Sequence, residues 1–262
     1  MDDVLICVPM RPTHPHVDLS TQMAIDALQW HGRMDVLYLG SVGDKPHAAD
    51  LADKLTRARH VALMCNYDAM LIVEADMLPP VDVLERLYEG DCDIAYGTYC
   101  SRRGNHAWLV TQSAQDIGHL EYFDKATLRG GGWIETQGIG TGCTLIHREA
   151  LQAIAFRGDE WTPDWYLAQD AVSLGLKQMH NLDVLCGHRI NEREVVYPDP
   201  TVQELHRIDS HPHAWRLSGQ YQVADGQRIG FSNGSIAEGG AAVSLADDVA
   251  LRMFRSGTIE EI

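Results

Sequence analysis

The stretch AMLIVEAD, residues 69–76, joins a run of five apolar residues to two carboxylates one residue apart. The apolar part contains two β-branched side chains and is typical of a strand buried on both faces of a sheet. In open α/β sheets, ligands bind at the carboxyl ends of such strands. Glu74 and Asp76 would repel each other there unless a hard cation or a metal-bound phosphate lay between them. A solvated strand-to-loop transition is the alternative interpretation of the same residues.

Length, composition and charge limit the class of protein. The chain has 262 residues, 45% of them hydrophobic and 22% charged, which is ample for one large α/β domain with a smaller appendage. A formal charge of −16 argues against tight, sequence-independent binding to a phosphate backbone. The six cysteines are scattered without a Cys-X-X-Cys pair, which favours free thiols in a reducing compartment. The sequence contains no signal-peptide pattern and no apolar run long enough to span a membrane, so a cytoplasmic location is expected.

Apolar strand patterns alternate with helical patterns over most of the chain. Strands are expected at 4–8, 36–39, 69–73, 93–98 and 182–186, with helices between them, one of them over about 48–66. This alternation predicts a mostly parallel sheet covered by helices on both faces. Residues 100–137 have no sustained period and are expected to form an irregular insertion, either functional or a surface excursion.

Further candidate residues lie in three places. Glycines alternate in Gly138-Ile139-Gly140-Thr141-Gly142, where the backbone can approach a bound group closely. Asp164 and Asp170 lie near the start of a predicted helix, where carboxylates are stabilised whatever else they do. His188 follows the last predicted strand and is a candidate metal ligand.

Taken together, these motifs resemble the GT-A fold of nucleotide-sugar glycosyltransferases, and in particular the glycosyltransferase family 2-like group. The resemblance covers about residues 3–190. It rests on Val8-Pro9 after the first strand, Arg59-His60, Glu74-Ala75-Asp76 in place of the family's Asp-X-Asp motif, Gly140-Thr141-Gly142, Gln169-Asp170 and His188.

The resemblance implies a role for each matching residue. Asp76 and His188, with Glu74 directly or through water, would hold Mn²⁺ or Mg²⁺ at the diphosphate of a UDP or GDP sugar. Asp170 would be the general base of an inverting transfer to an acceptor hydroxyl. The nucleotide sugar would be bound by residues of the pocket and of the glycine loop: Pro9, Arg11, Asp44, Arg59, Glu74, Ala75, Gly140, Thr141 and Gly142. Glu74 departs from the family's usual aspartate, and Gln169 from its usual acidic neighbour.

Two other functions are open at this stage: a nucleotidyltransferase, and a non-catalytic module that binds nucleotides or glycans. A nucleotidyltransferase usually has a glycine-rich basic loop after the first strand, whereas this loop is rich in proline. The acceptor is open between a glycan, a small metabolite, a protein and a modified nucleobase.

The resemblance divides the chain into a domain at 1–190 and a C-terminal extension at 191–262. The extension is expected to contain a connector, a small hairpin built from 221–223 and 228–231, and a short amphipathic helix within 245–255. That helix would pack on the main domain or on a partner chain, which leaves a homo-oligomer open.

Overall fold

The computed structural model describes residues 2–10, 19–102, 107–116, 119–138, 140–190, 194–198, 205–207, 221–223, 228–230, 236–238, 242–243 and 259–261. The chain divides into two units, Met1–His213 and Ala214–Ile262, which are described separately below.

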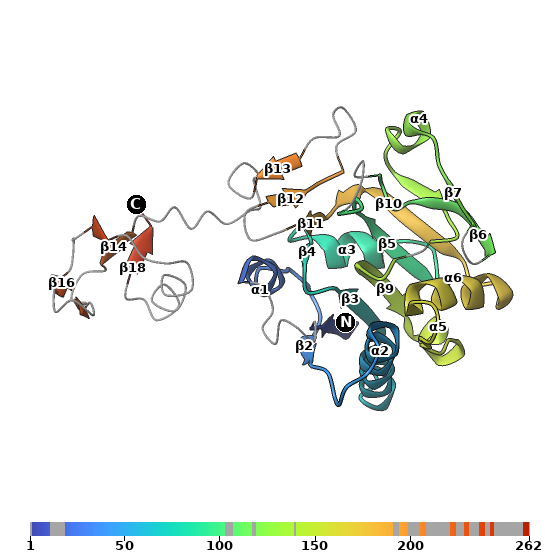
Figure 1. The fold of residues 1–262 in the computed structure, drawn as a ribbon, viewed down its shortest axis with the longest axis horizontal. Helices are drawn as coiled ribbons and strands as arrows, with labels where there is room; N and C mark the ends of the chain where they lie inside the picture. The colour runs from blue at the N-terminus through green and yellow to red at the C-terminus, as the bar shows by residue number, and fades with distance from the viewer. Residues whose placement is uncertain are drawn as a thin grey trace. The chain divides into compact units, whose positions relative to one another are not determined.

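A seven-stranded sheet runs through the described part of the first unit, in the order β2-β1-β3-β9-β5-β10-β8 (Figure 1). Its strands are β1 (Val4–Pro9), β2 (Met34–Leu39), β3 (Ala69–Val73), β5 (Ile94–Thr98), β8 (Trp133–Glu135), β9 (Cys143–His147) and β10 (Gln178–Leu185). Five of them run in one direction, and only β8 and β9 run in the other. The sheet is therefore mixed but mostly parallel.

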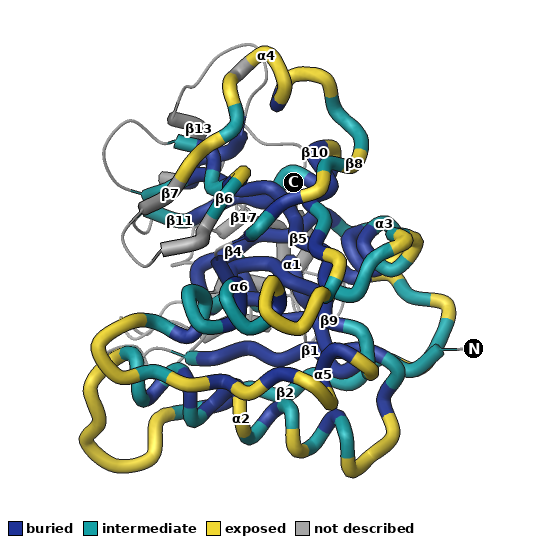
Figure 2. The backbone as a smooth tube through the Cα atoms, turned by 90° about the vertical axis from the view of Figure 1, so that its right-hand side faces the viewer, coloured by how far each residue is buried: buried dark blue, intermediate teal, exposed yellow. Residues whose placement is uncertain are grey.

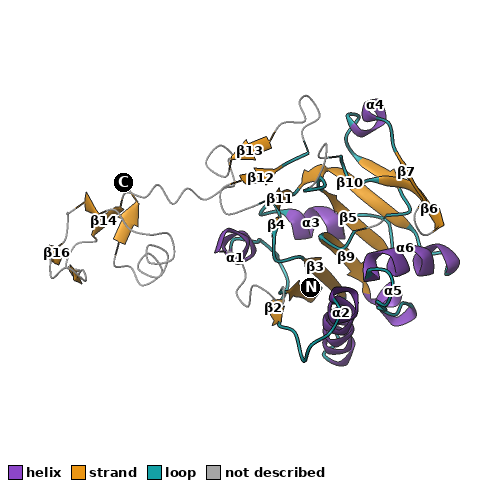
Figure 3. Cartoon of the chain, viewed as in Figure 1, coloured by secondary structure: helices purple, strands orange, loops and turns teal. Residues whose placement is uncertain are grey.

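Helices cover both faces of this sheet (Figure 3). α1 (Leu19–Asp26) and α3 (Val83–Tyr88) contribute Ile25, Leu84 and Leu87 to the core on one face. α2 (His47–Met64), α5 (Arg148–Ala153) and α6 (Pro163–Ser173) contribute Leu55, Leu151 and Leu167 to the core on the other. The central strands are buried between these layers (Figure 2). The predicted three-layer α/β class is confirmed.

None of the helices in the described ranges has both the length and the apolar composition needed to cross a bilayer.

The order of the strands reverses at β1. From β1 the chain passes through α1 to β2 on one side, and then through α2 to β3 on the other side of β1. Ligands of doubly wound sheets bind at such a switch point, beyond the carboxyl ends of the strands. The carboxyl ends of β1 and β3, marked by Pro9 and Glu74, are therefore the first place to look for a site.

The observed elements agree with the expected ones where the apolar pattern is strong. β3 has the predicted bounds, whereas β10 begins at Gln178 rather than at Leu182. The first residues of β10 include Gln178, His180 and Asn181, which are buried although they are polar. A strand whose buried positions carry polar side chains produces no hydrophobic alternation, so its start could not be read from the sequence.

The insertion at 100–137 contains regular structure. β6 (Thr111–Asp116) pairs with β7 (His119–Tyr122), and α4 (Lys125–Leu128) follows. β8 then joins the edge of the main sheet by pairing with β10. The expectation of an irregular segment is therefore wrong for the parts that the structure describes.

A second, smaller sheet connects the end of β3 with the region around His188. Its order is β13-β12-β11-β4, and its strands are β4 (Met77–Leu78), β11 (Gly187–Arg189), β12 (Glu194–Val196) and β13 (Leu205–Arg207). The pairing of β11 with β12 crosses the expected domain division after residue 190. That division stays a prediction.

The second unit contains five short strands in its described residues: β14 (Tyr221–Val223), β15 (Arg228–Gly230), β16 (Ile236–Glu238), β17 (Ala242–Val243) and β18 (Ile259–Glu261). β14 pairs with β17 and β18, whereas β15 pairs with β16. The expected hairpin of β14 with β15 is therefore wrong: both strands exist, but each takes other partners. The helix expected within 245–255 lies outside the described residues.

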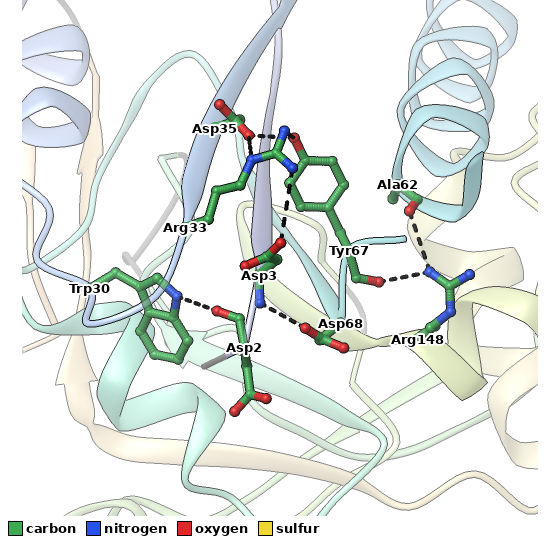
Figure 4. A network of polar contacts seen from close by, with 9 residues as sticks. All are labelled: Asp2, Asp3, Trp30, Arg33, Asp35, Ala62, Tyr67, Asp68 and Arg148. Carbon is green, nitrogen blue, oxygen red and sulfur yellow. Dashed lines mark hydrogen bonds and ion pairs between the residues drawn. The ribbon is translucent and has the colours of Figure 1, made fainter. Parts of the chain in front are cut away.

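Polar contacts fasten the amino-terminal edge of the main sheet (Figure 4). Arg33 Nε lies 2.6 Å from Asp35 Oδ2, and Tyr67 Oη donates to the same oxygen at 2.5 Å. Arg148 donates to the carbonyls of Tyr67 and Leu63, at 2.9 and 3.1 Å. The last carbonyls of a helix have no partner inside the helix, so Arg148 satisfies part of the end of α2. The charges of Arg33, Asp35 and Arg148 therefore stabilise the fold.

His180 provides a test of the core. It is 1% exposed, stacks on Tyr96 at 4.9 Å, and burial lowers its pKa to about 3. Since the unfolded chain takes up this proton below about pH 6.5 and the folded chain does not, stability is lost as the pH falls. We expect wild type to lose about 2 kcal/mol of unfolding free energy relative to His180→Phe between pH 7 and pH 5, measured by urea denaturation. Parallel pH dependences of the two proteins would contradict the neutral, buried state of this imidazole.

Candidate functional site

The site begins where the chain leaves β3. The N–H of Glu74 donates to the carbonyl of Gly142 at 2.9 Å, and the N–H of Met77 donates back to the carbonyl of Glu74 at 2.9 Å. The chain therefore turns tightly at residues 74–77 and is fastened to the glycine loop. This turn fixes the two acidic side chains at the carboxyl end of the strand, beside the switch point.

Asp76 and His188 are 112 residues apart in the sequence and meet in the structure. His188 is paired with Met77 in the register of β11 with β4, and the N–H of Arg189 donates to the carbonyl of Asp76 at 2.8 Å. His188 Nε2 lies 3.2 Å from Asp76 Oδ2, and both residues are buried. The small sheet thus brings the two predicted metal ligands together.

The hydrogen bond on the other ring nitrogen determines what this contact means. His188 Nδ1 lies 2.7 Å from the carbonyl oxygen of Cys100. Because a carbonyl oxygen can only accept, Nδ1 must carry a hydrogen, and the neutral ring then presents a lone pair on Nε2. A lone pair and a carboxylate oxygen at this distance both require a positive partner, either a proton or a metal ion.

Arg102 already supplies a positive charge to this carboxylate. Its Nη1 lies 2.8 Å from Asp76 Oδ2, the same oxygen that faces His188. About one third of the Arg102 side chain is exposed, whereas Asp76 is almost fully covered. The sequence analysis placed this residue only within the irregular insertion at 100–137, because the contact depends on a long-range approach of the loop after β5.

Glu74 is hydrogen-bonded to the glycine loop. It accepts a hydrogen bond from Thr141 Oγ1 at 2.7 Å. Burial, and then the charges of Asp76 and Asp164, hold the pKa of Glu74 above its ordinary value. Negative charge is thus crowded at this edge, which favours the arrival of a cation.

Tyr99 supports the glycine loop and was not predicted as a site residue. Its hydroxyl accepts from the N–H of Gly142 at 3.2 Å, and its ring lies edge-on to His188 with centroids 5.6 Å apart. Burial, and then the charge of Glu74, hold the Tyr99 pKa well above its usual range. Tyr99 therefore stays neutral and braces both the loop and the histidine.

The two aspartates of α6 have different surroundings. Asp170 forms an ion pair with Arg157. Burial raises the pKa of Asp164, although hydrogen bonds from Thr162 and from the N–H of Trp165 act against the rise. Six residues along an α-helix turn the direction of a side chain by about 120° and move it about 9 Å along the axis, so the two carboxylates cannot serve one point. The charge of Asp164 acts on Glu74 and Tyr99, which identifies it as the helix carboxylate near the site.

The remaining predicted residues lie at several places. Pro9 ends β1, Ala75 is buried between the two acids, and Asp44 is exposed in the loop before α2. The guanidinium of Arg59 donates to the carbonyls of Leu151 and Gln152, at 2.6 and 3.1 Å, and so ties α2 to α5. The structure therefore does not bring Arg59 to the carboxylates. Arg11 lies outside the described residues.

A buried ion pair at this edge was missed by the sequence analysis. Lys54 and Asp50 are each 2% exposed in their side chains, and Lys54 Nζ also donates to the carbonyl of Met10 at 2.5 Å. Ser41 Oγ donates to Asp50 Oδ2 at 2.9 Å. The pair links α2 to the segments that follow β1 and β2. A lysine among apolar helix positions is ordinarily a solvated residue, so the sequence contained no clear signal.

Protein side chains supply few cation ligands here. In the described residues, no group of three or more His, Cys, Asp or Glu is arranged to hold a metal ion. Asp76 and His188 fit a divalent ion that obtains its other ligands from water and phosphate oxygens, as Mg²⁺ commonly does. Two cis ligands of such an ion lie about 3 Å apart, given bonds of about 2.1 Å, and the Asp76–His188 contact of 3.2 Å is of that size.

Comparison with known proteins gives neighbours in structure but none in sequence. No protein-family model matches the chain, and neither does any curated protein. The crystal structure of A197 from STIV matches with a TM-score of 0.53 and 20% identity, over 83% of this chain and 98% of that one. At this identity, the likeness shows a shared fold.

Glycosyltransferases are found among the more distant structural neighbours. The catalytic domain of Drosophila β1,4-galactosyltransferase 7, in complex with xylobiose, matches with a TM-score of 0.47 and 11% identity, over 95% of this chain and 97% of that one. A single-residue mutant of the same enzyme, in complex with manganese, UDP-Gal and xylobiose, matches with a TM-score of 0.45 and 13% identity, over 73% of this chain and 69% of that one.

Gly140 provides a test of the glycine loop. Its φ is +122°, and a Cβ atom there would lie 2.1 Å from the hydroxyl of Tyr99. Gly132 has a φ of +74° with open space around it, so it is a matched control for backbone strain alone. We expect Gly140→Ala to lower the unfolding free energy by about 3 kcal/mol or more and Gly132→Ala by about 1 kcal/mol, measured by urea denaturation. Equal losses would show that Tyr99 does not press on the loop.

Proposed function

We propose that the chain is a metal-dependent glycosyltransferase of the GT-A type, which moves a sugar from a nucleoside-diphosphate sugar to an acceptor hydroxyl. The observation that carries this proposal is the contact of Asp76 with His188 at the carboxyl end of β3. An imidazole nitrogen and a carboxylate oxygen that face each other in a buried site can share a metal ion as well as a proton. The switch point beside them is where nucleotides bind in folds of this kind.

Asp76 and His188 would hold Mn²⁺ or Mg²⁺, and the carbonyl of Cys100 would keep the imidazole in the tautomer that coordinates through Nε2. The ion supplies electrostatic stabilisation of the negative charge that develops on the leaving diphosphate. Glu74, fixed by the Thr141 hydroxyl, would contact the ribose or a water molecule of the ion. Thr141 and Gly142 would border the sugar.

The nucleoside of a UDP or GDP sugar would lie over the carboxyl ends of β1 and β2. Pro9 ends the first of these strands, and Asp44 lies in the loop after the second. The buried Lys54–Asp50 pair of α2 contacts the residues that follow the ends of these two strands, Met10 and Ser41. Lys54 donates to the carbonyl of Met10, the residue that follows β1.

Asp164 is our candidate for the general base, in place of Asp170. A base must reach the hydroxyl that it deprotonates, and a raised pKa strengthens a carboxylate as a proton acceptor. Asp164 is partly buried and its pKa is raised by burial, whereas Asp170 is engaged with Arg157. A single base on the acceptor side suits an inverting displacement, in which the proton leaves the hydroxyl as its oxygen attacks the sugar.

The metal ligands give the first test. We expect Asp76→Asn and His188→Gln each to weaken Mn²⁺ binding in the presence of UDP by at least about tenfold, because the first removes the negative charge of one ligand and the second removes the imidazole nitrogen of the other. The double variant should lose less than the two single losses combined, since the residues act on one ion. Isothermal titration calorimetry measures both affinities, and Asp91→Asn, at an exposed aspartate paired with Lys177, is the control. Unchanged Mn²⁺ affinity in the single variants would place the cation elsewhere.

The two aspartates of α6 give the second test. Asp164→Asn should lower kcat by about 10²–10⁴ and leave the binding of UDP with Mn²⁺ unchanged, because it removes proton transfer only. Asp170→Asn should keep kcat within a few-fold of wild type. The reverse result would restore Asp170 as the base.

A panel of nucleotide sugars with Mn²⁺ tests the activity itself. Sugar transfer to water, or to added glycans, should release UDP or GDP in a metal-dependent way. Release of pyrophosphate from a nucleoside triphosphate and a sugar phosphate, without turnover of any nucleotide sugar, would instead identify a nucleotidyltransferase.

A further inference from the structure

Arg102 contacts the carboxylate of Asp76, which is also a ligand of the proposed cation site. Its Nη1 and the imidazole of His188 share one oxygen, Asp76 Oδ2, at 2.8 and 3.2 Å. Asp76 is 7% exposed, so a positive neighbour contributes more to its charge balance than it would in water. In the structure, the guanidinium is a cationic partner of this buried carboxylate.

The segment that carries Arg102 is anchored just before it. The backbone of Cys100 forms an isolated antiparallel β-bridge with that of Trp108. The N–H of Ser101 donates to the carbonyl of Ala107 at 2.8 Å. The carbonyl of Cys100 also accepts a hydrogen bond from His188 Nδ1. The same short segment thus fixes the histidine and delivers the arginine, so the contact of Arg102 with Asp76 is built into the site.

A divalent ion bound to Asp76 Oδ2 and His188 Nε2 would lie next to Arg102 Nη1. Two cations on one carboxylate oxygen repel each other, and the repulsion is strong where water is scarce. The arginine is the partner that can move, because its side chain is long and about one third exposed. Binding of the metal therefore requires Arg102 to leave the carboxylate.

We propose that Arg102 neutralises Asp76 in the metal-free protein, yields this carboxylate to the cation, and then binds the diphosphate of the donor. The inference rests on the proposed function, since it needs both the metal and a nucleoside diphosphate. A diphosphate on the metal brings negative oxygens to the place that the guanidinium has left. The planar fork of arginine binds two such oxygens at once, which a lysine cannot do. Arg102 then has an anionic partner in both states.

This exchange predicts effects of opposite sign on two ligands. Arg102→Met keeps the length of the side chain and removes its charge. Without UDP, this variant should bind Mn²⁺ about tenfold more tightly than wild type, because no guanidinium competes for Asp76. With saturating Mn²⁺, it should bind UDP about tenfold more weakly, because a bidentate phosphate contact is lost. Arg102→Lys should bind Mn²⁺ like wild type but still bind UDP more weakly than wild type.

Isothermal titration calorimetry with Mn²⁺ alone, and then with UDP at saturating Mn²⁺, measures both effects. Arg86→Met is the matched control, since Arg86 is also 32% exposed and pairs with an aspartate, Asp82. Weakening of both ligands, or no change in either, would overturn the exchange. If neither wild type nor Arg102→Met bound Mn²⁺, the proposed metal site itself would fall, and the exchange with it. UDP binding by wild type that EDTA leaves unchanged would also overturn it, because Arg102 would then be the permanent cation.

Discussion

His188 Nδ1 donates a hydrogen bond to the carbonyl of Cys100, and the rest of the site depends on the ring orientation that this bond fixes. Nε2 is then the ring nitrogen that faces the carboxylate of Asp76, at 3.2 Å. A proton or a metal ion can bridge these two atoms. β4, which follows the turn after β3, pairs with β11, which contains the histidine, and this pairing brings the two residues together. Tyr99 contacts both the glycine loop and the ring of His188.

Carboxylates matched by basic side chains occur at both edges of the main sheet, as in the contacts of Arg33 with Asp35 and of Arg102 with Asp76. At the carboxyl edge, burial raises the pKa values of Glu74 and Asp164, which means that their charged forms are disfavoured in the folded chain. An edge that served only stability would not retain such groups. Perturbed carboxylates gathered in one place are instead typical of sites that bind cations or move protons.

The sequence predicts the fold where the interior is apolar. Residues 69–73 form a strand with the expected bounds because each of their side chains is buried in a hydrophobic layer. The start of β10 is not predicted by the sequence because its first buried positions hold the polar residues Gln178, His180 and Asn181. Arg102 could not be identified at all. Its role depends on a loop that approaches Asp76 from another part of the chain, and no local pattern records that approach.

Asp164 shows why a position in a helix is a weak guide to function. A carboxylate in the first turn of a helix is stabilised by the backbone dipole, usually by less than about 1 kcal/mol, so such a residue is ordinarily explained by the helix itself. If this were its main role, its pKa would be depressed. The hydrogen bonds from Thr162 and from the N–H of Trp165 act in that direction, yet burial outweighs them and the pKa is raised. The helix terminus therefore does not account for this aspartate.

The residues on which Asp164 acts lie at the glycine loop. Its charge raises the pKa values of Glu74 and Tyr99, and both of these residues are hydrogen-bonded to that loop. Asp170, on another side of the same helix, has an arginine for a partner and requires no further explanation.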